Sequence, residues 1–306
     1  MNTILVVDSH ALIHRAYHAI PPLTTKSGQP TNALYGFLGL LHKAVKDIQP
    51  THIAACFDTP TESFRAKLLS TYQATRKPTD EALKSQFSLV REAVKAAHIA
   101  LFEAPNYEAD DAIGTVVTQL KSEALLRGVP FRIIIFSGDK DMFQLVDEHV
   151  FVLTPQIGFS KAQLYGPAEV VTKMFVSPEY VADLKALSGD PSDNYKGLHK
   201  IGPKTAAKLI AEFGHIENMD ARFDAETMTL LRTMKQVSTI VTDVPSIDAH
   251  LQDVLFTGYN DELADVIRTY EVFSLLPRFF AKKQDTDNKP ESKPKVIDQP
   301  QSESLF

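Results

Sequence analysis

Short apolar runs rich in β-branched and aromatic residues recur along the first half of this chain. They occupy residues 4–7, 53–57, 131–136 and 150–153, and longer segments with helical patterns separate them. Near-continuous apolar strands that alternate with helices indicate a parallel sheet covered on both faces. The predicted fold class is therefore α/β, with a central, mostly parallel sheet flanked by helices.

Three of these runs end beside acidic residues. Asp8 follows the first run, Asp58 follows the second, and Asp139 and Asp141 follow the third. Ligands of parallel sheets gather outside the carboxyl ends of the strands. We therefore expect these four carboxylates to meet at one edge of the sheet, a placement that turn propensity alone does not explain.

Two further acidic groups extend this set. Glu108-Ala-Asp110-Asp111 opens a segment of helical character, and Asp190 and Asp193 lie in a turn-rich stretch. Acidic caps at helix starts and aspartates in turns would explain both groups without any ligand. For each group taken alone, that alternative stays open.

The nine carboxylates together favour a metal centre. They are Asp8, Asp58, Glu108, Asp110, Asp111, Asp139, Asp141, Asp190 and Asp193. Oxygen ligands alone suit Mg²⁺, for which Mn²⁺ can substitute, and disfavour zinc or copper. So many acids would repel one another without cations, so the sequence predicts at least two ions. Paired ions of this kind support in-line phosphodiester hydrolysis.

A first group of basic residues precedes the helical acidic segment. Residues 63–78 hold Arg65, Lys67, Arg76 and Lys77 and have no obvious apolar stripe. These side chains form either a solvated helix face or a contact with phosphates.

A second group of basic residues surrounds a predicted helix that begins at Pro203 and ends at Gly214. Its candidate contacts are Lys196, Lys200, Gly202, Lys204, Thr205 and Lys208. Glycine at a helix start lets a phosphate approach free backbone N–H groups. We interpret this stretch as a helix-hairpin-helix element that holds a nucleic-acid backbone without reading its sequence.

Composition narrows the class of protein. The chain has 306 residues, of which 44% are hydrophobic, and its single cysteine excludes an internal disulfide. The net charge of −6 argues at first against a nucleic-acid partner, but the chain outside the nine acids carries a small positive surplus. No apolar run is long enough to cross a membrane and no signal sequence is evident, so we expect a cytoplasmic protein without a membrane partner.

An ordered set of motifs resembles a known nuclease family. The motifs are Val7-Asp-Ser-His10, Arg15-Ala-Tyr-His-Ala19, Tyr35-Gly-Phe37, Phe57-Asp58, Ser63-Phe-Arg65, Glu108-Ala-Asp-Asp111, Gly138-Asp-Lys-Asp141, Gly189-Asp-Pro-Ser-Asp-Asn194 and Ile201-Gly-Pro-Lys-Thr-Ala206. In this order, from about residue 3 to 280, they are similar to the 5′ nuclease domain of bacterial DNA polymerase I, a member of the flap endonuclease group. No polymerase region follows, so the chain resembles the free-standing form.

The resemblance implies a PIN-like 5′ nuclease core, with a helical arch at about residues 62–97, and a 5′-3′ exonuclease and flap endonuclease activity. It assigns Asp8, Asp58, Glu108, Asp110, Asp111 and Asp139 to a first metal site and Asp141, Asp190 and Asp193 to a second, with Arg76 as a further catalytic residue. We expect DNA contacts from Arg15, Arg65, Lys67, Tyr72, Lys77, Lys196, Lys200, Gly202, Lys204, Thr205 and Lys208. Backbone carbonyls of the hairpin would also hold K⁺.

The chain departs from the family pattern at three places. Ser9 follows Asp8 where glycine is usual, and Lys196 and Lys200 replace a common proline and glycine in the hairpin. Gln73 follows Tyr72 where the family has a lysine thought to stabilise charge on the scissile phosphate. This last departure keeps open the alternative of a structure-specific DNA-binding module with weak or no turnover. A PIN-type endoribonuclease is a further alternative, but it should lack the hairpin and the second group of acids.

We divide the chain into a catalytic core at residues 1–175, a helical DNA-binding region at 176–280 and a disordered tail at 281–306, where polar residues dominate. The expected partners are branched, flapped or nicked DNA and RNA–DNA primer strands, with the protein a monomer at the bacterial nucleoid. The last residues, 301–306, resemble peptides that bind the sliding clamp.

Overall fold

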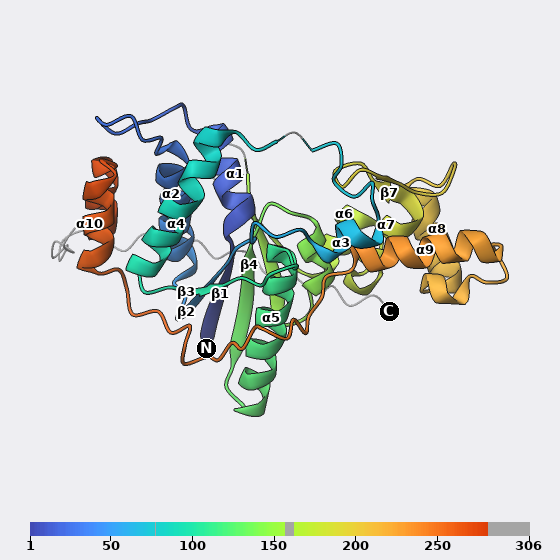
Figure 1. The fold of residues 1–306 in the computed structure, drawn as a ribbon. Helices are drawn as coiled ribbons and strands as arrows, with labels where there is room; N and C mark the ends of the chain where they lie inside the picture. Colours follow the sequence, from blue (N-terminus) through green and yellow to red (C-terminus); the bar gives the residue numbers. More distant parts are fainter. Residues whose placement is uncertain (77, 157–161, 281–306) are drawn as a thin grey trace.

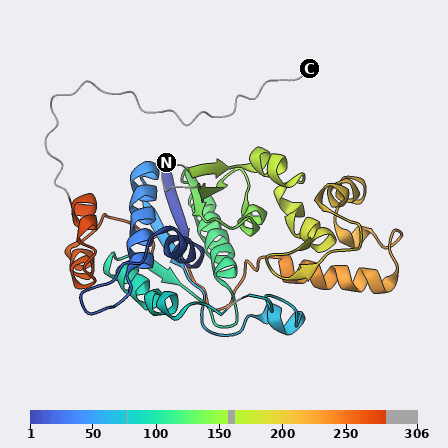
Figure 2. The ribbon, with the colours of Figure 1, turned by 90° about the horizontal axis from the view of Figure 1, so that it is seen from above.

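A six-stranded sheet forms the centre of the molecule, and helices cover both of its faces (Figure 1, Figure 2). The computed structural model describes residues 1–76, 78–156 and 162–280. The strands are β1 (Asn2–Asp8), β2 (His52–Cys56), β3 (Ala100–Phe102), β4 (Phe131–Phe136), β5 (Val150–Pro155) and β6 (Ala162–Tyr165). Their order is β3-β2-β1-β4-β5-β6, and β6 alone among them runs antiparallel to its neighbour. The predicted α/β class is confirmed.

The alternation of side chains along β1 explains the layers. Ile4 and Val6 belong to one apolar core, whereas Leu5 and Val7 belong to a second core on the other face. Helices α1 (Ser9–Ala19), α2 (Asn32–Ile48), α4 (Glu81–Ala96) and α10 (Asp261–Thr269) build the second core. Helix α5 (Ala109–Leu126) covers the first. Because both faces are buried, the strands are almost entirely apolar.

Parallel pairing brings the strand ends to one edge of the sheet. Asp8 lies opposite Cys56, and Val7 lies opposite Phe136. The residues that follow β1, β2 and β4 therefore emerge side by side, as the sequence predicted for the acids at these positions. No described helix is long and apolar enough to span a membrane.

The second half of the chain adds a group of helices beside the carboxyl edge of the sheet (Figure 1). It comprises α6 (Pro167–Met174), α7 (Val181–Ser188), α8 (Pro203–Phe213) and α9 (Ala225–Ser238), with 3-10 turns η1 (Asp141–Leu145), η2 (Pro178–Tyr180) and η3 (Ile216–Asn218). Two short strands, β7 (Gly189–Asp190) and β8 (Tyr195–Lys196), join α7 to α8. Apolar residues of α7, α8 and α9 belong to the same core as α5.

The chain then returns to the sheet. Side chains at every fourth position of α5 hold the returning segment, around residues 240–255: Thr115 accepts from the Val244 N–H at 3.1 Å, and Gln119 accepts from the Ala249 N–H at 2.8 Å. The Ile53 N–H of β2 donates to the Val254 carbonyl at 2.7 Å. Helix α10, η4 (Phe273–Leu275) and α11 (Leu276–Phe280) follow, and α10 packs on α4. Residues 176–280 are thus not one helical unit.

The predicted arch at residues 62–97 is shorter than expected. Helix α4 packs in the core through Leu83, Val90 and Val94, so it belongs to the layer that covers the sheet. Only α3 (Phe64–Leu68) and the non-helical residues after it remain. We call residues 69–80 the bridging segment; Lys77 lies outside the described residues. In Figure 1 the bridging segment crosses the molecule from α3 to α4.

Candidate metal centre and nucleic-acid surface

Seven acidic side chains line one cavity of about 630 Å³ at the carboxyl edge of the sheet. They are Asp8, Asp58, Glu108, Asp110, Asp139, Asp141 and Asp193. Tyr72, Gln73 and Arg76 of the bridging segment line the same cavity. The structure therefore brings together most of the acids that the sequence singled out, although they are spread over nearly two hundred positions of the chain.

Helix starts hold two of these carboxylates in place, and a tyrosine hydroxyl holds a third. Asp8 caps α1: its Oδ1 accepts from the Ala11 N–H at 3.0 Å and its Oδ2 accepts from the Ser137 hydroxyl at 2.5 Å. Asp58 accepts from the Ala109 N–H at the start of α5 at 2.5 Å. Glu108, the residue before α5, accepts from the Tyr72 hydroxyl at 3.0 Å. Capping and clustering thus coincide, because the helices begin at the edge where the strands end.

The charges in this cavity oppose one another. Burial raises the pKa of Asp8 to about 7, and the charges of Asp139 and Asp58 add to the rise. The hydrogen bond from Ser137 acts in the opposite direction and lowers this pKa. Burial also raises the pKa of Asp110 well above its ordinary value, with Asp139 and Asp8 again contributing. A set of mutually repelling oxygen donors fits hard divalent cations, which would relieve the repulsion.

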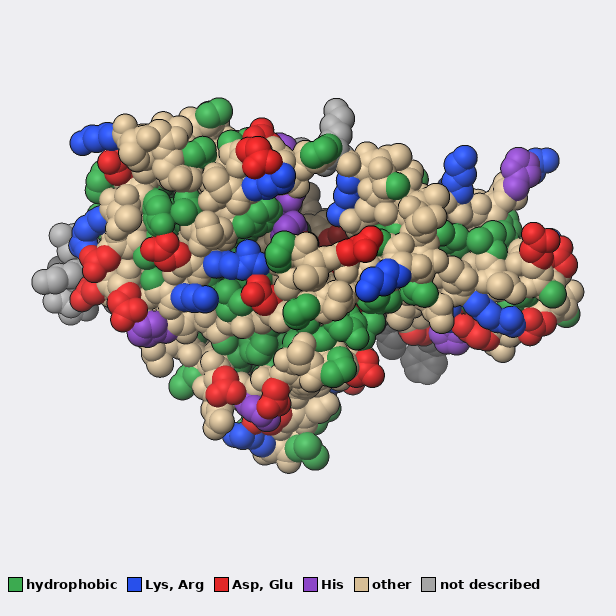
Figure 3. Space-filling view, viewed as in Figure 1, with side chains coloured by type: hydrophobic (Ala, Val, Ile, Leu, Met, Phe, Trp, Pro, Cys, Tyr) green, Lys and Arg blue, Asp and Glu red, His purple; other side chains and the backbone are tan. Residues whose placement is uncertain are grey.

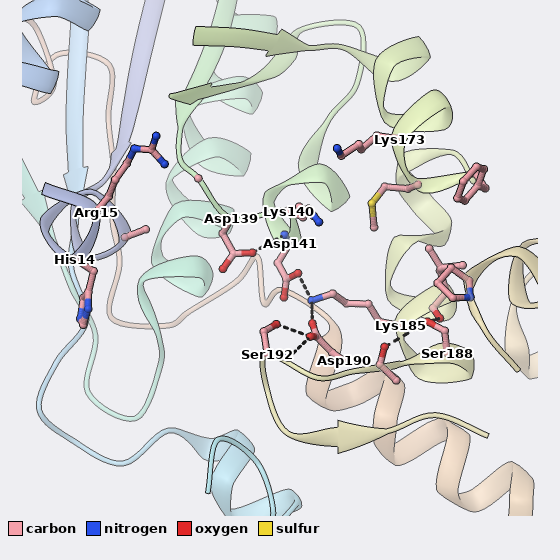
Figure 4. Close-up of a pocket in the computed structure, with 17 residues that line it drawn as sticks. His14, Arg15, Asp139, Lys140, Asp141, Lys173, Lys185, Ser188, Asp190 and Ser192 are labelled. Carbon is pink, nitrogen blue, oxygen red and sulfur yellow. Dashed lines mark hydrogen bonds and ion pairs between the residues drawn. The ribbon is translucent and has the colours of Figure 1, made fainter. Parts of the chain in front are cut away.

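A second acidic group adjoins the first. Asp141, Asp190 and Asp193 each offer one oxygen within 4.8 Å of the others. The ammonium of Lys185, on α7, pairs with Asp141 and lies 2.5 Å from Asp190 Oδ2 (Figure 4). Burial raises the pKa of Asp141 to about 7 in spite of Lys185. Burial alone would also raise the pKa of Asp190, but Lys185 and Ser192 hold it below its usual range.

Lys185 is a functional candidate that no motif in the sequence pointed to. Its ammonium already neutralises part of the second acidic group, so a cation bound there would share these carboxylates with Lys185 or displace it. The available signal was a single cation in the apolar helix Val181–Ser188, five positions before Asp190. Buried lysines are rare unless they are paired, so this position called for a carboxylate partner.

Two predicted site residues, Asp111 and Arg65, instead form a buried structural pair. Arg65 is only 3% exposed, and its guanidinium donates to both oxygens of Asp111 at 2.6 and 2.7 Å. It also donates to the Val237 and Thr239 carbonyls at 2.8 Å. Asp111 is fully buried and accepts a further bond from the Val241 N–H. The metal role of Asp111 and the DNA contact of Arg65 were therefore wrong, because each satisfies the other away from solvent.

Tyr72 has a structural role at the cavity. Its ring is buried in the core, and its hydroxyl donates to Glu108 at the rim of the cavity. It therefore positions a carboxylate, and its predicted contact with DNA stays a prediction.

Gln73, at the position where a lysine was expected, holds the second acidic group. Its backbone adopts the left-handed conformation, with φ of 52°, and its N–H donates to the Asp193 carbonyl at 2.9 Å. Its side-chain amide donates to Asp193 Oδ1 at 3.2 Å, and Arg76 donates to the same oxygen at 3.1 Å. The bridging segment is thus fastened to a predicted metal ligand.

The predicted hairpin exposes its basic residues. Lys196, Lys200, Gly202, Lys204, Thr205 and Lys208 are all exposed, as is Lys67 near the bridging segment. Lys200 adopts a left-handed φ of 63°, which glycine would adopt without cost. A Cβ on Gly197 would lie 2.1 Å from the Ser188 carbonyl carbon, so β7 and β8 require glycine there. Arg15 is half-buried and donates to the Gln156 carbonyl at 2.8 Å. The DNA contacts of these residues stay predictions.

Comparison with known proteins places this fold and site among nucleases. A family model described as "5'-3' exonuclease, N-terminal resolvase-like domain" matches residues 3–175, and "5'-3' exonuclease, C-terminal SAM fold" matches residues 176–262. A 5'-3' exonuclease of Aquifex aeolicus is 35% identical over 219 residues, which is 72% of this chain and 72% of that protein. DNA polymerase I of Bacillus caldotenax is 34% identical over 302 residues, 95% of this chain but 33% of the polymerase.

Solved structures share the fold at lower identity. "T5 D15 Protein Co-crystallized with Metal Ions" has a TM-score of 0.61 and 19% identity, and the match covers 89% of this chain and all of that one. The catalytic core of Rad2 in complex with DNA substrate has a TM-score of 0.53 and 16% identity, covering 90% of this chain and 93% of that one.

The fold and its acidic cavity are thus those of a 5′ nuclease. The chain belongs to the 5′-3′ exonuclease family. It spans about a third of the length of the DNA polymerase I relatives that it matches.

Proposed function

We propose that this chain is a structure-specific 5′ nuclease, acting as a 5′-3′ exonuclease and flap endonuclease on branched, flapped or nicked DNA. The observation that carries the proposal is the convergence of seven acidic side chains in one cavity beneath the bridging segment. The exposed hairpin lysines beside it offer a second, sequence-independent hold on the DNA backbone. A PIN-type endoribonuclease would not need this hairpin.

Mg²⁺ is the metal that we assign, with Mn²⁺ as a substitute. Asp8, Asp58, Glu108, Asp110 and Asp139 would hold a first ion, and Asp141, Asp190 and Asp193 a second. Divalent cations bound there supply Lewis acidity to a phosphodiester and its attacking water. The fold similarity to the T5 protein crystallised with metal ions supports a metal-binding role for this edge of the sheet.

Residues of this chain would supply binding and orientation. The side chain of Arg76 is 58% exposed above the cavity, so its guanidinium can move from Asp193 to a phosphate of the 5′ strand. Ser137 and Tyr72 keep Asp8 and Glu108 in place through their hydroxyls. The hairpin would bind duplex DNA through its lysines, with K⁺ on backbone carbonyls around Gly202.

The proposed setting is bacterial DNA replication and repair, including the processing of Okazaki fragments and of RNA–DNA primer strands. The similarity to DNA polymerase I supports this setting. In this proposal, residues 1–175 supply most of the catalytic acids, Asp190 and Asp193 complete the second metal site, and the hairpin within residues 176–280 binds DNA. The protein acts as a monomer located at the nucleoid of the cytoplasm. The sliding-clamp peptide, residues 301–306, lies outside the described residues; unchanged clamp affinity after its deletion would refute that partner.

The Asp139→Asn variant tests the role of the acidic cavity. We predict that cleavage of a 5′-flap duplex falls by at least about a hundredfold, because the metal site loses one negatively charged oxygen ligand. DNA affinity measured by fluorescence anisotropy in Ca²⁺ should stay within about twofold. Asp243→Asn, at an exposed acid on the returning segment, is the matched control. Equal cleavage by Asp139→Asn and the wild type would refute the site.

A further inference from the structure

Phe175 combines two features that each carry an energetic cost. It ends α6 with a φ of 67°, and its N–H donates to the Val171 carbonyl at 2.8 Å. Helices often end in this left-handed conformation, but usually on glycine or asparagine. Phe175 is also 52% exposed. The other non-glycine residues with positive φ in the described ranges are all polar, so Phe175 stands apart from them.

The surroundings of Phe175 connect it to the acidic site. A cavity of about 700 Å³ has Asp139, Asp141 and Asp190 in its wall, and Phe175, Lys173 and Pro203 line it as well. In Figure 4, Arg15 and Lys173 lie on opposite sides of Asp139 and Asp141. A chain that leaves the acidic group along this cavity would therefore meet Phe175.

One lysine lies over the exposed ring, and a second lines the same cavity. Lys204 Nζ, in the first turn of α8, lies 5.9 Å from the centroid of the Phe175 ring. Lys173 lies two positions before Phe175 and is exposed. An exposed aromatic ring with one ammonium over it and a second lysine on the wall of the same cavity suits a nucleotide, whose base or sugar packs on the ring while its phosphates meet the lysines. A phenylalanine that served only to fill the core would be buried and would not need lysines near it.

We propose that Phe175 is a stacking platform for an unpaired or terminal nucleotide at the discontinuity of the DNA substrate. The proposal rests on the proposed function, since it places this nucleotide next to the acidic cavity. Bases inside a continuous duplex present no free face, whereas a base at a flap, nick or end does. Phe175 therefore contributes to the recognition of interrupted DNA and leaves binding to continuous duplex unaffected.

Three variants test this inference. Phe175→Gly removes the ring and suits the positive φ, so it should fold at least as well as the wild type. Phe175→Asn, which also tolerates this conformation, is the second variant, and Phe175→Trp keeps an aromatic face. Phe273→Ala is the control, because Phe273 is 53% exposed and lies in η4 beside α10.

The readout is affinity in Ca²⁺ for a 5′-flap duplex and for a covalently closed duplex circle, with 2-aminopurine at the flap junction. We expect Phe175→Gly and Phe175→Asn to weaken flap binding by about fivefold or more, from the usual contribution of base–aromatic stacking. The 2-aminopurine quenching should be lost, while binding to the closed circle and the melting temperature stay unchanged. Phe175→Trp should behave as the wild type.

Unchanged flap affinity and quenching in Phe175→Gly would overturn the inference, as would an equal loss in Phe273→Ala or an equal loss on the closed circle. Cleavage by the wild type is measured in parallel with Mg²⁺. A wild type that binds but does not cut refutes the proposed function alone. A wild type that cuts while Phe175→Gly binds and cuts equally well refutes the stacking role alone.

Discussion

Lys185 shows how one residue can decide the state of an acidic site. Its ammonium and the carboxylates of Asp141 and Asp190 are mostly buried, with exposed side-chain fractions of 10–13%. Removal of the cation leaves two adjacent carboxylates without their partner. Such a change is costly in a protein interior, because the remaining charges are neither paired nor solvated.

We predict that Lys185→Met lowers the free energy of unfolding by about 3 kcal/mol in EDTA near pH 8, the usual cost of breaking a buried pair. Mg²⁺ should recover part of the loss, because a cation can then neutralise Asp141 and Asp190. Chemical denaturation with and without Mg²⁺ measures both effects. Lys84→Met, which breaks the exposed pair with Glu81, should cost less than about 1 kcal/mol. Equal losses in the two variants would contradict this account of Lys185.

At the residue scale, the sequence located the acids but not their pairing. Asp8, Asp58 and Asp139 could be predicted because an apolar strand precedes each of them and fixes its place at the edge. Asp111 differs from Asp110 only by the 100° turn of a helix, which points it to Arg65 instead of the cavity. The sequence of an acidic run does not reveal which of its carboxylates faces the cavity and which is paired in the protein interior.

Among the elements, α5 couples the sheet to the returning segment. Gly114 lies where α5 passes this segment, and a Cβ there would lie 2.6 Å from Ile240 Cγ2 and 2.8 Å from the Val241 carbonyl oxygen. Neither neighbour is the free end of a long side chain. The close approach therefore requires glycine, although glycine weakens a helix interior.

We predict that Gly114→Ala destabilises the protein by about 1–3 kcal/mol, the usual cost of overpacking. Gly39→Ala is the matched control: Gly39 lies inside α2 and a Cβ there would meet nothing within 4 Å. This second change should stabilise the protein by about 1 kcal/mol through helix propensity. Denaturant midpoints of the two variants should move in opposite directions; a shift in the same direction would contradict the packing described here.

The elements with a regular period could be predicted, and those without one could not. The strands and α8, from Pro203 to Phe213, follow from apolar runs and from the Pro and Gly at the helix ends. The returning segment around residues 240–255 has no regular spacing of apolar residues. Its backbone is held by the side chains of Thr115 and Gln119 on α5, and a contact of this kind leaves no pattern in the sequence. The arch was overestimated because the apolar stripe of α4 did not show which surface it covers.

On the scale of the whole molecule, the acidic cavity links stability to pH. Folding raises the pKa of Asp8 and Asp141 to about 7, from about 4 in an unfolded chain. The folded protein then binds more protons than the unfolded chain between these values. Stability contributed by the two acids is therefore present below about pH 4 and is lost as the pH rises to about 7.

We predict that Asp8→Asn changes this dependence in EDTA: relative to the wild type, the variant should gain stability as the pH rises from about 5 to about 7.5. Comparison with the wild type separates the effect of the Asp8 carboxylate from that of His10 and His14. Burial lowers the pKa values of these two histidines, so their contribution to stability rises with pH, opposite to that of Asp8. Melting temperatures across this range measure the difference. A constant difference between the two proteins would show that the Asp8 pKa is not raised.

The most direct test of the proposed nuclease activity is cleavage of a labelled 5′-flap DNA duplex by the purified protein, with Mg²⁺ or with EDTA, beside an RNA strand of equal sequence. We predict cutting of the DNA near the junction with Mg²⁺ and none with EDTA. Tight binding without cutting in Mg²⁺ and Mn²⁺ would contradict it, and would direct attention to Gln73, where Gln73→Lys would show whether the missing charge silences the site.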